Sequence, residues 1–172
     1  MRVLLPVGRS PLLTYLFYLH PLSILAQEDR YLPWFYSRFI QLLRYPGECL
    51  KMLVEAGSTS PQISHAYALS CPLLDVQSLE LEAASALTAD WAAGCAALLG
   101  KGYYVQTDVD YYHLAHRPEC GQEHFLHELL LVGVDGDQLL ALTNGRRGEP
   151  VQVEVPAATL CRATAELASV RA

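Results

Sequence analysis

Two apolar runs separated by Asp135-Gly136-Asp137 constrain the fold of this chain more than any other feature of its sequence. The runs are Phe125–Val134 and Leu139–Thr143. Asp and Gly between apolar runs are typical of a β-hairpin turn, because glycine adopts positive φ without steric cost. The sequence therefore predicts two antiparallel strands over residues 125–143.

One further strand is predicted just before this hairpin and another just after it. Tyr103–Val109 combines aromatic and β-branched residues, and Pro150–Val155 alternates apolar with polar residues. Together with the hairpin, these strands predict an antiparallel sheet over about residues 101–156. An Ala-rich helix is expected to follow at 157–170 and to pack on the sheet.

Helical patterns dominate the earlier part of the chain. The predicted helices are Pro33–Leu43, which begins at its proline, Glu48–Ala56, and Ala89–Leu99, which Thr88 caps.

The N-terminal stretch is less regular in its pattern. Residues 1–10 are expected to form a loop, and the apolar residues 11–26 fit either a short helix or a strand. Pro21 disfavours one continuous helix there. Helices over about residues 11–100, followed by the antiparallel sheet, predict an α+β fold in a single domain spanning 1–172.

The position of a histidine in the predicted hairpin indicates a candidate site. His127 begins an otherwise apolar strand, and a three-residue loop at 135–137 would bring Asn144 beside residues 127–129. A histidine that acts as a general base needs a partner to fix its tautomer, and asparagine can be that partner. The alternative is a structural histidine at a strand end and an asparagine that belongs to a turn.

Composition excludes some classes of partner. The chain is acidic, with a formal net charge of −6 and no basic cluster beyond Arg146-Arg147, so a nucleic-acid partner is not expected. No apolar run reaches the length of a membrane span. Five scattered cysteines without a Cys-x-x-Cys pair indicate reduced thiols. Prolines interrupt the apolar N-terminal run, which disfavours a secretion signal, so a cytoplasmic protein is expected.

A histidine-rich segment raises a metal-binding alternative. Zinc ligands could come from His113, His116, Glu119, Cys120, His124 and His127. Residues three apart on a strand face opposite sides, so His124 and His127 would chelate together only if His124 lay in a loop. A solvated loop is the favoured interpretation, and neither a metal nor another cofactor is predicted.

The later part of the chain resembles a known family. The succession KGYYVQTDVDYYHL, HFLHELLLVGVDGDQLLAL and TNGRRGEPVQVEVPAATL resembles the later half of the N-terminal domain of the butirosin biosynthesis protein H family. It is more distantly similar to the bacteriocin-processing, papain-like cysteine peptidases. The resemblance implies a papain-like fold with His127 as the base, Asn144 as its orienting partner and Asp110 in the acidic position of the preceding strand.

The family's nucleophile is a cysteine near the N-terminus, whereas the first cysteine of this chain is Cys49. Cys49 lies in the first turn of a predicted helix, where a thiol ionises more readily. Ser37 and Ser23 are the other candidate nucleophiles, and His127 could instead deprotonate an amine directly. The expected substrate-binding residues are Trp34, Asp110 and His124.

The activity implied by the resemblance is acyl or aminoacyl transfer in the biosynthesis of a specialised metabolite. An acyl or peptidyl carrier protein would supply the thioester, and a small-molecule amine would accept the acyl group. Two alternatives stay open at this point. One is a catalytically inactive binding or scaffold protein on the same fold, and the other is a cysteine peptidase.

Overall fold

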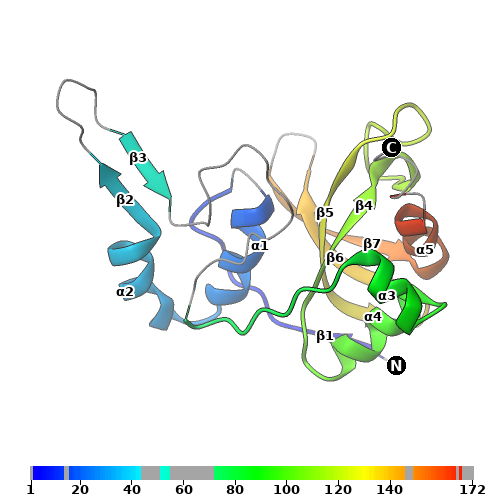
Figure 1. Cartoon of the computed structure of the whole chain (residues 1–172), viewed down its shortest axis with the longest axis horizontal. Coiled ribbons are helices and arrows are strands. Elements are labelled where there is room, and N and C mark those ends of the chain that lie inside the picture. Colours follow the sequence, from blue (N-terminus) through cyan, green and yellow to red (C-terminus); the bar gives the residue numbers. More distant parts are fainter. Residues whose placement is uncertain are drawn as a thin grey trace.

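The computed structural model describes residues 2–13, 16–43, 51–54, 72–145, 149–165 and 167. Within them the chain has an α+β fold, in which helices pack on both faces of a curled antiparallel sheet (Figure 1). The strands of this sheet are β1 (Arg2–Leu4), β4 (Val105–Asp110), β5 (Leu126–Asp135), β6 (Gln138–Asn144) and β7 (Pro150–Pro156).

The long strand β5 organises the sheet. One of its edges pairs with β4 over Leu126–Leu131 and then with β1 over Gly133–Asp135, while its other edge pairs with β6. β1 occupies part of the loop expected for residues 1–10, whereas residues 5–10 form neither a helix nor a strand. A Cβ added at Gly133 would lie 2.5 Å from the Val3 carbonyl oxygen, so the absence of a side chain lets β1 approach β5.

The predicted hairpin is confirmed, although its turn differs from the expected one. Asp135 pairs with Gln138, so the loop has two residues, and Gly136 takes the positive φ of 63°. The predicted three-residue loop is therefore wrong. A β-bulge between Leu131 and Gly133 inserts the missing residue, because two residues of β5 there oppose one of β6. The two differences cancel, and beyond the bulge the register is the expected one.

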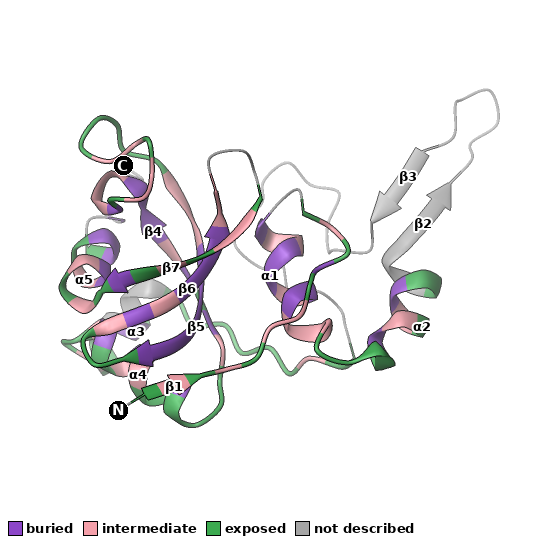
Figure 2. Cartoon of the chain, turned by 180° about the vertical axis from the view of Figure 1, so that it is seen from behind, coloured by how far each residue is buried: buried purple, intermediate pink, exposed green. Residues whose placement is uncertain are grey.

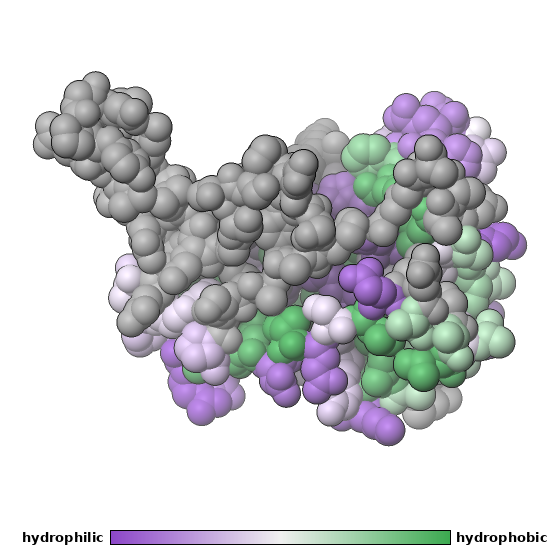
Figure 3. All heavy atoms as spheres, viewed as in Figure 1, coloured by the Kyte–Doolittle hydropathy of each residue, from purple (hydrophilic) through white to green (hydrophobic). Residues whose placement is uncertain are grey.

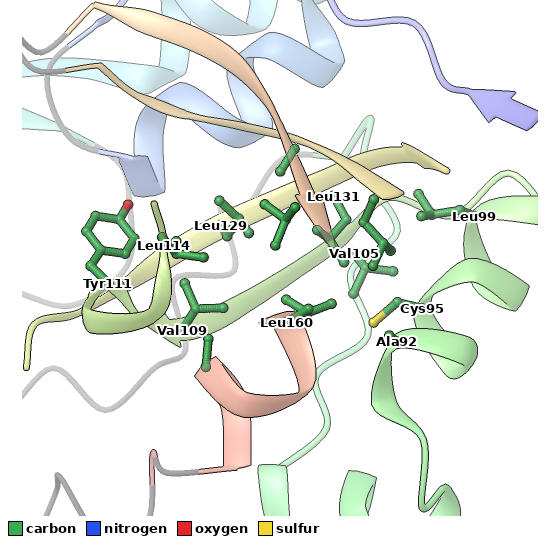
Figure 4. Packing of buried hydrophobic residues seen from close by; sticks show 14 residues of the cluster. Ala92, Cys95, Leu99, Val105, Val109, Tyr111, Leu114, Leu129, Leu131 and Leu160 are labelled. Atoms are coloured by element: carbon green, nitrogen blue, oxygen red, sulfur yellow. The ribbon is translucent and has the colours of Figure 1, made fainter. Parts of the chain in front are cut away.

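The main core lies between the sheet and α4 (Trp91–Gly100) together with α5 (Ala157–Ala165) (Figure 4). Alternate strand residues point into this core. Its buried members include Cys95, Leu99, Val109, Leu129, Leu131 and Leu160. The predicted α4 is confirmed except that its cap is Asp90, whose side chain accepts the Ala93 N–H at 3.0 Å.

The opposite face of the sheet packs against α1 (Leu16–Leu25), as Figure 2 shows from behind. Leu130, Val132 and Leu142 are buried there with Ile24 of α1 packed against them. The helix continues through Pro21, so the expected break at this proline is wrong. α1 therefore covers the row of sheet residues that alternates with the main core.

Residues 29–43 and 51–54 differ most from the expected helices. A 3-10 turn η1 (Asp29–Tyr31) leads into α2 (Leu32–Trp34) and a π-helical turn η2 (Phe35–Phe39), and the chain then forms β2 (Ile40–Leu43). β2 pairs with β3 (Lys51–Val54). The predicted helix over 33–43 is thus wrong in its second half, and the one over 48–56 is wrong at 51–54. Local helical periodicity is a weak preference that strand pairing overrides here.

The remaining helix is α3 (Leu81–Leu87), which precedes α4. Apolar side chains gather on the surface over these two helices in Figure 3. Leu87 and Leu98 are exposed. In the described parts of the chain we find no helix with both the length and the apolar character needed to cross a bilayer.

Candidate functional site

A buried carboxylate and a half-exposed imidazole meet at the end of β4. Asp110 is completely buried, and its Oδ2 lies 2.5 Å from Nδ1 of His124. The other carboxylate oxygen, Oδ1, accepts the backbone N–H groups of Tyr112 at 3.0 Å and Phe125 at 3.1 Å. Both oxygens of Asp110 are thus hydrogen-bonded, which holds the carboxylate in one orientation.

The path of the chain explains why these residues meet. β4 ends at Asp110, the 3-10 turn η3 (Tyr111–His113) follows, and a loop returns to β5, where Leu126 pairs with Asp110. Closing the loop at this pair brings His124 and Phe125 beside the aspartate. An aspartate that accepts the N–H two residues later forms an Asx turn, and this turn starts the loop.

The ring of His124 is held on two sides. Its Nδ1 donates to Asp110, and the ring stacks on Tyr112 with centroids 4.4 Å apart and planes 17° apart. The side chain is 47% exposed, and among the described residues Nε2 has no hydrogen-bond partner. With Nδ1 protonated, the neutral ring carries its lone pair on Nε2, which is the arrangement a general base needs.

Two opposing influences act on the ionisation of Asp110. Burial raises the pKa of the carboxyl group, whereas the hydrogen bonds from His124 and from the Tyr112 and Phe125 N–H groups lower it, and the net pKa lies below 3.8. The aspartate is therefore charged at neutral pH. A carboxylate in this position stabilises the imidazolium that forms when His124 takes a proton.

The expected pair of His127 and Asn144 is not formed. Nδ1 of His127 accepts the backbone N–H of Glu128 at 2.9 Å, and the ring stacks on Tyr111 with centroids 5.5 Å apart. The Asn144 Oδ1 is buried, and no described residue is its hydrogen-bond partner. Leu130 pairs with Leu142, so alternation places Asn144 on their face of the sheet and His127 on the other.

A side-chain network fastens the loop after η3 to the end of β6. Arg117 donates from Nη1 to the Asn144 carbonyl oxygen at 2.6 Å, lies 4.3 Å over the Tyr111 ring and pairs with Glu119 at 3.2 Å. The Tyr111 hydroxyl lies 2.9 Å from Thr143 Oγ1. Sequence reasoning missed Arg117 and Tyr111, because nothing local to either residue indicates its distant partner.

The candidate nucleophiles do not complete the site within the described residues. Cys49 lies outside them. Ser23 is buried on α1, and Ser37 is exposed on η2, where its hydroxyl donates to the Pro33 carbonyl at 2.5 Å. Neither serine is hydrogen-bonded to a histidine of the described ranges. Trp34 packs in a separate cluster around Leu22, Tyr31 and Phe35, away from Asp110 and His124.

The metal alternative gains no support from the geometry. In the described ranges, no three side chains among His, Cys, Asp and Glu are grouped so that they could hold a metal ion. His124 does lie in a loop, as joint chelation with His127 would require, but its Nδ1 is bonded to Asp110.

No protein-family model, no curated protein and no solved structure matches this chain. The case for a function therefore depends on the geometry of its own side chains.

Proposed function

We propose that this chain is an acyl-transferring enzyme of papain-like architecture in which His124, oriented by Asp110, is the general base. The observation that carries the proposal is the 2.5 Å contact between the buried Asp110 carboxylate and Nδ1 of His124, with Nε2 left for substrate. The α+β order of elements and the antiparallel sheet agree with a papain-like fold.

The proposed reaction passes an acyl or aminoacyl group from a carrier-protein thioester to an amine. Nε2 of His124 takes a proton from the amine as its nitrogen attacks the thioester carbonyl carbon. The new C–N bond forms, the C–S bond breaks, and the departing thiolate takes the proton from the imidazolium. Asp110 stays charged throughout and stabilises the imidazolium. This route requires no nucleophile from the protein.

His124 replaces His127 as the base because the geometry around the two rings differs. In His127, Nδ1 accepts the backbone N–H of Glu128, and among the described residues no carboxylate or amide side chain is hydrogen-bonded to the ring, although Oε2 of Glu128 lies 3.4 Å from Nδ1. In His124, a buried carboxylate fixes the tautomer. The role that the family resemblance assigns to Asn144 therefore passes to Asp110.

The test compares two histidine variants in one assay. The full chain is mixed with an acyl-pantetheine thioester and a primary amine, and the amide product is quantified by mass spectrometry. His124→Gln is expected to lower the rate by about 10² to 10⁴-fold, the usual contribution of a general base. His127→Gln is the matched control and should retain the rate. A rate lost in H127Q and retained in H124Q would contradict the assignment.

The same reaction tests whether a protein nucleophile participates. Direct transfer leaves the mass of the protein unchanged during turnover, whereas a covalent route adds the acyl mass to a cysteine or serine. Peptide mapping would then identify the residue, with Cys49 and Ser23 as the candidates. An acyl-enzyme that forms and decays at the turnover rate would contradict the direct route.

A second candidate function is binding without catalysis. The observation that favours it is that, among the described residues, no Ser or Cys side chain is hydrogen-bonded to His124. A binding or scaffold protein would retain the acylated carrier without forming the amide, and H124Q would leave that retention unchanged.

A further inference from the structure

The edge strand β7 has a sequence that reads almost the same in both directions. Its residues Pro150–Pro156 are PVQVEVP, in which only Gln152 and Glu154 break the symmetry about Val153. β7 is the last strand of the sheet and pairs with β6 on one side, and among the described residues no strand pairs with its other side. An edge strand with a symmetric sequence is suited to pair with a copy of itself.

The hydrogen bonds that flank β7 show which of its backbone groups face away from β6. The Ala157 N–H donates to the Asp137 carbonyl oxygen at 2.9 Å, and the Gly145 N–H donates to the Glu149 carbonyl oxygen at 2.6 Å. The register between these two pairs is continuous. Hydrogen-bonded and unbonded pairs alternate in an antiparallel ladder, so the odd-numbered residues of β7 bond to β6. The even-numbered residues therefore direct their N–H and C=O groups to the outer edge.

Two prolines limit the donors of this outer edge. Pro150 and Pro156 are even-numbered, and proline has no N–H, so neither removes a hydrogen bond to β6. The outward N–H donors of β7 are those of Gln152 and Glu154. A strand that pairs with this edge has to supply acceptors for these two groups.

We infer that β7 pairs antiparallel with the β7 of a second copy of this chain, in a register centred on Val153. Gln152 of each copy then lies opposite the partner's Glu154, and each of these pairs exchanges two backbone N–H···O=C hydrogen bonds. The outward N–H groups of both strands are all satisfied in this way. The prolines, which cannot donate, lie opposite each other.

The side chains match in the same register. Val153 packs against the main core and Val155 is buried in it, while Val151 is half-buried on the same face. In the dimer each Val151 lies opposite the partner's Val155, which continues this apolar row across the two copies. Gln152 and Glu154 are exposed on the other face, where each carboxylate lies beside an amide that can donate to it.

Neighbouring registers lack this match. A pair centred on Glu154 would place two like charges directly opposite each other, which is destabilising. A pair centred on Gln152 would leave each glutamate opposite Pro150, which has no donor. Because both copies use the same strand, the contact closes as a two-fold dimer and does not extend into a fibre.

This contact uses neither Asp110 nor His124, so it stands whether or not the chain transfers acyl groups. One pair of strands is a small interface, and interfaces below about 1,200 Å² are transient. Sedimentation velocity of the full chain, from about 10 μM to 1 mM, should therefore show a reversible monomer–dimer equilibrium. Amide exchange at Gln152 and Glu154 should slow as the concentration rises, whereas the Val153 N–H, which bonds to β6, should change little.

Two substitutions of Gln152 test the register. Gln152→Glu sets like charges opposite each other and Gln152→Lys sets opposite charges together. The dissociation constant of the dimer should rise in Q152E and fall in Q152K, each by about 2- to 30-fold. Gln77→Glu and Gln77→Lys are the matched controls, because they change the charge equally at an exposed residue outside the helices and strands. Both should leave the dissociation constant nearly unchanged.

A third variant removes a donor from the outer edge alone. Gln152→Pro deletes an N–H that β6 does not use, so the variant should fold, with the circular dichroism of the wild-type protein, and stay monomeric.

Three results would overturn the inference. They are a wild-type chain that is monomeric at every concentration, a dimer whose dissociation constant moves in the same direction in Q152E and Q152K, and slow exchange at Gln152 and Glu154 already in the dilute monomer. The last result would mean that another part of the same chain covers the edge. Protection of these two amides by an added extended peptide, without a dimer, would identify a different occupant and would also contradict the inference.

Discussion

The Asp110 carboxylate and the His124 imidazole lie 2.5 Å apart, the first completely buried at the end of β4 and the second half-exposed in the following loop. The charge of Asp110 is thus buried, while the His124 ring that it orients is half-exposed. The carboxylate accepts two backbone N–H groups in addition to the histidine, so it stays charged in a place where an unpaired carboxylate would not.

Replacement of Asp110 by asparagine should destabilise the protein in a pH-dependent way. Because the folded pKa is below the ordinary value, the aspartate stabilises the fold above about pH 4, and this contribution is lost as the pH falls through the folded pKa. At pH 7 we expect Asp110→Asn to lower the free energy of unfolding by about 1.5–3 kcal/mol. Urea denaturation from pH 2 to 7 measures this difference, which should shrink towards the acidic end.

Asp75→Asn is the control for that experiment, because Asp75 is exposed. Its effect should stay within about 0.5 kcal/mol at every pH. A difference between wild type and D110N that is equally large at pH 2 and pH 7 would contradict the role assigned to the charge.

Replacement of His20 by leucine should remove the decline in stability that we expect for the wild-type protein between pH 6.5 and 3. The folded pKa of His20 is lowered to about 3 from 6.5, so as the pH falls below 6.5 the unfolded chain takes up a proton that the folded one excludes. Wild-type stability should therefore decline from pH 6.5 towards 3, by up to about 1.4 kcal/mol per pH unit. His20→Leu should flatten this part of the curve and, by removing two unpaired nitrogens, raise stability by about 1 kcal/mol at pH 7.

Denaturant titrations of both proteins across this pH range make the comparison. An H20L variant with the wild-type slope between pH 3 and 6.5 would show that His20 is accessible to protons in the folded state.

The Arg117 network predicts that lysine cannot replace this arginine. The guanidinium contacts the Tyr111 ring, the Glu119 carboxylate and the Asn144 carbonyl at the same time, and its side chain is only 12% exposed. A lysine has one nitrogen and no planar face. We expect Arg117→Lys to cost about 1–3 kcal/mol in denaturant unfolding.

Arg30 is the matched control for Arg117. It pairs with Glu28 at 2.7 Å in an exposed position, where an ion pair contributes little. Arg30→Lys should change stability by less than about 0.5 kcal/mol. Equal effects of the two substitutions would indicate that the Arg117 contacts are not maintained in solution.

The close approach of β1 to β5 predicts that Gly133→Ala is destabilising. A Cβ at this position would meet the Val3 carbonyl oxygen, so β1 must move away. We expect a loss of about 1–3 kcal/mol and faster hydrogen exchange at the Leu5 N–H, which donates to the Val132 carbonyl oxygen at 2.7 Å. Gly94→Ala in α4 is the control and should stay within about 1 kcal/mol of wild type. Unchanged exchange at Leu5 in G133A would contradict the predicted displacement.

The β-hairpin shows how far local pattern extends. Turn residues and period-two alternation predicted β5 and β6 to within a few residues, because those signals lie in neighbouring positions. The length of the loop was wrong and the bulge was not foreseen. The register beyond the bulge agreed because the two differences cancel.

Local sequence pattern does not determine the strand register at the candidate site. The sequence brought Asn144 near residues 127–129, but only to within one residue, and a shift of one residue exchanges the two faces of a strand. The structure pairs Leu130 with Leu142, so alternation places Asn144 on their face of the sheet and His127 on the other.

The helical region shows the same limit. Ile40–Leu43 and Lys51–Val54 have apolar residues that suit a helix as well as a strand, and they form strands because each pairs with the other. Only the spatial proximity of the two segments distinguishes these outcomes.

By itself, the sequence determined the class of the fold and the antiparallel sheet, because composition, turn chemistry and side-chain periodicity can be read from consecutive residues. Only the tertiary structure decided which histidine has an orienting partner. The orienting partner depends on how the loop after β4 closes and on which face of the sheet each side chain lies. Both are set by contacts between residues that are distant in the chain.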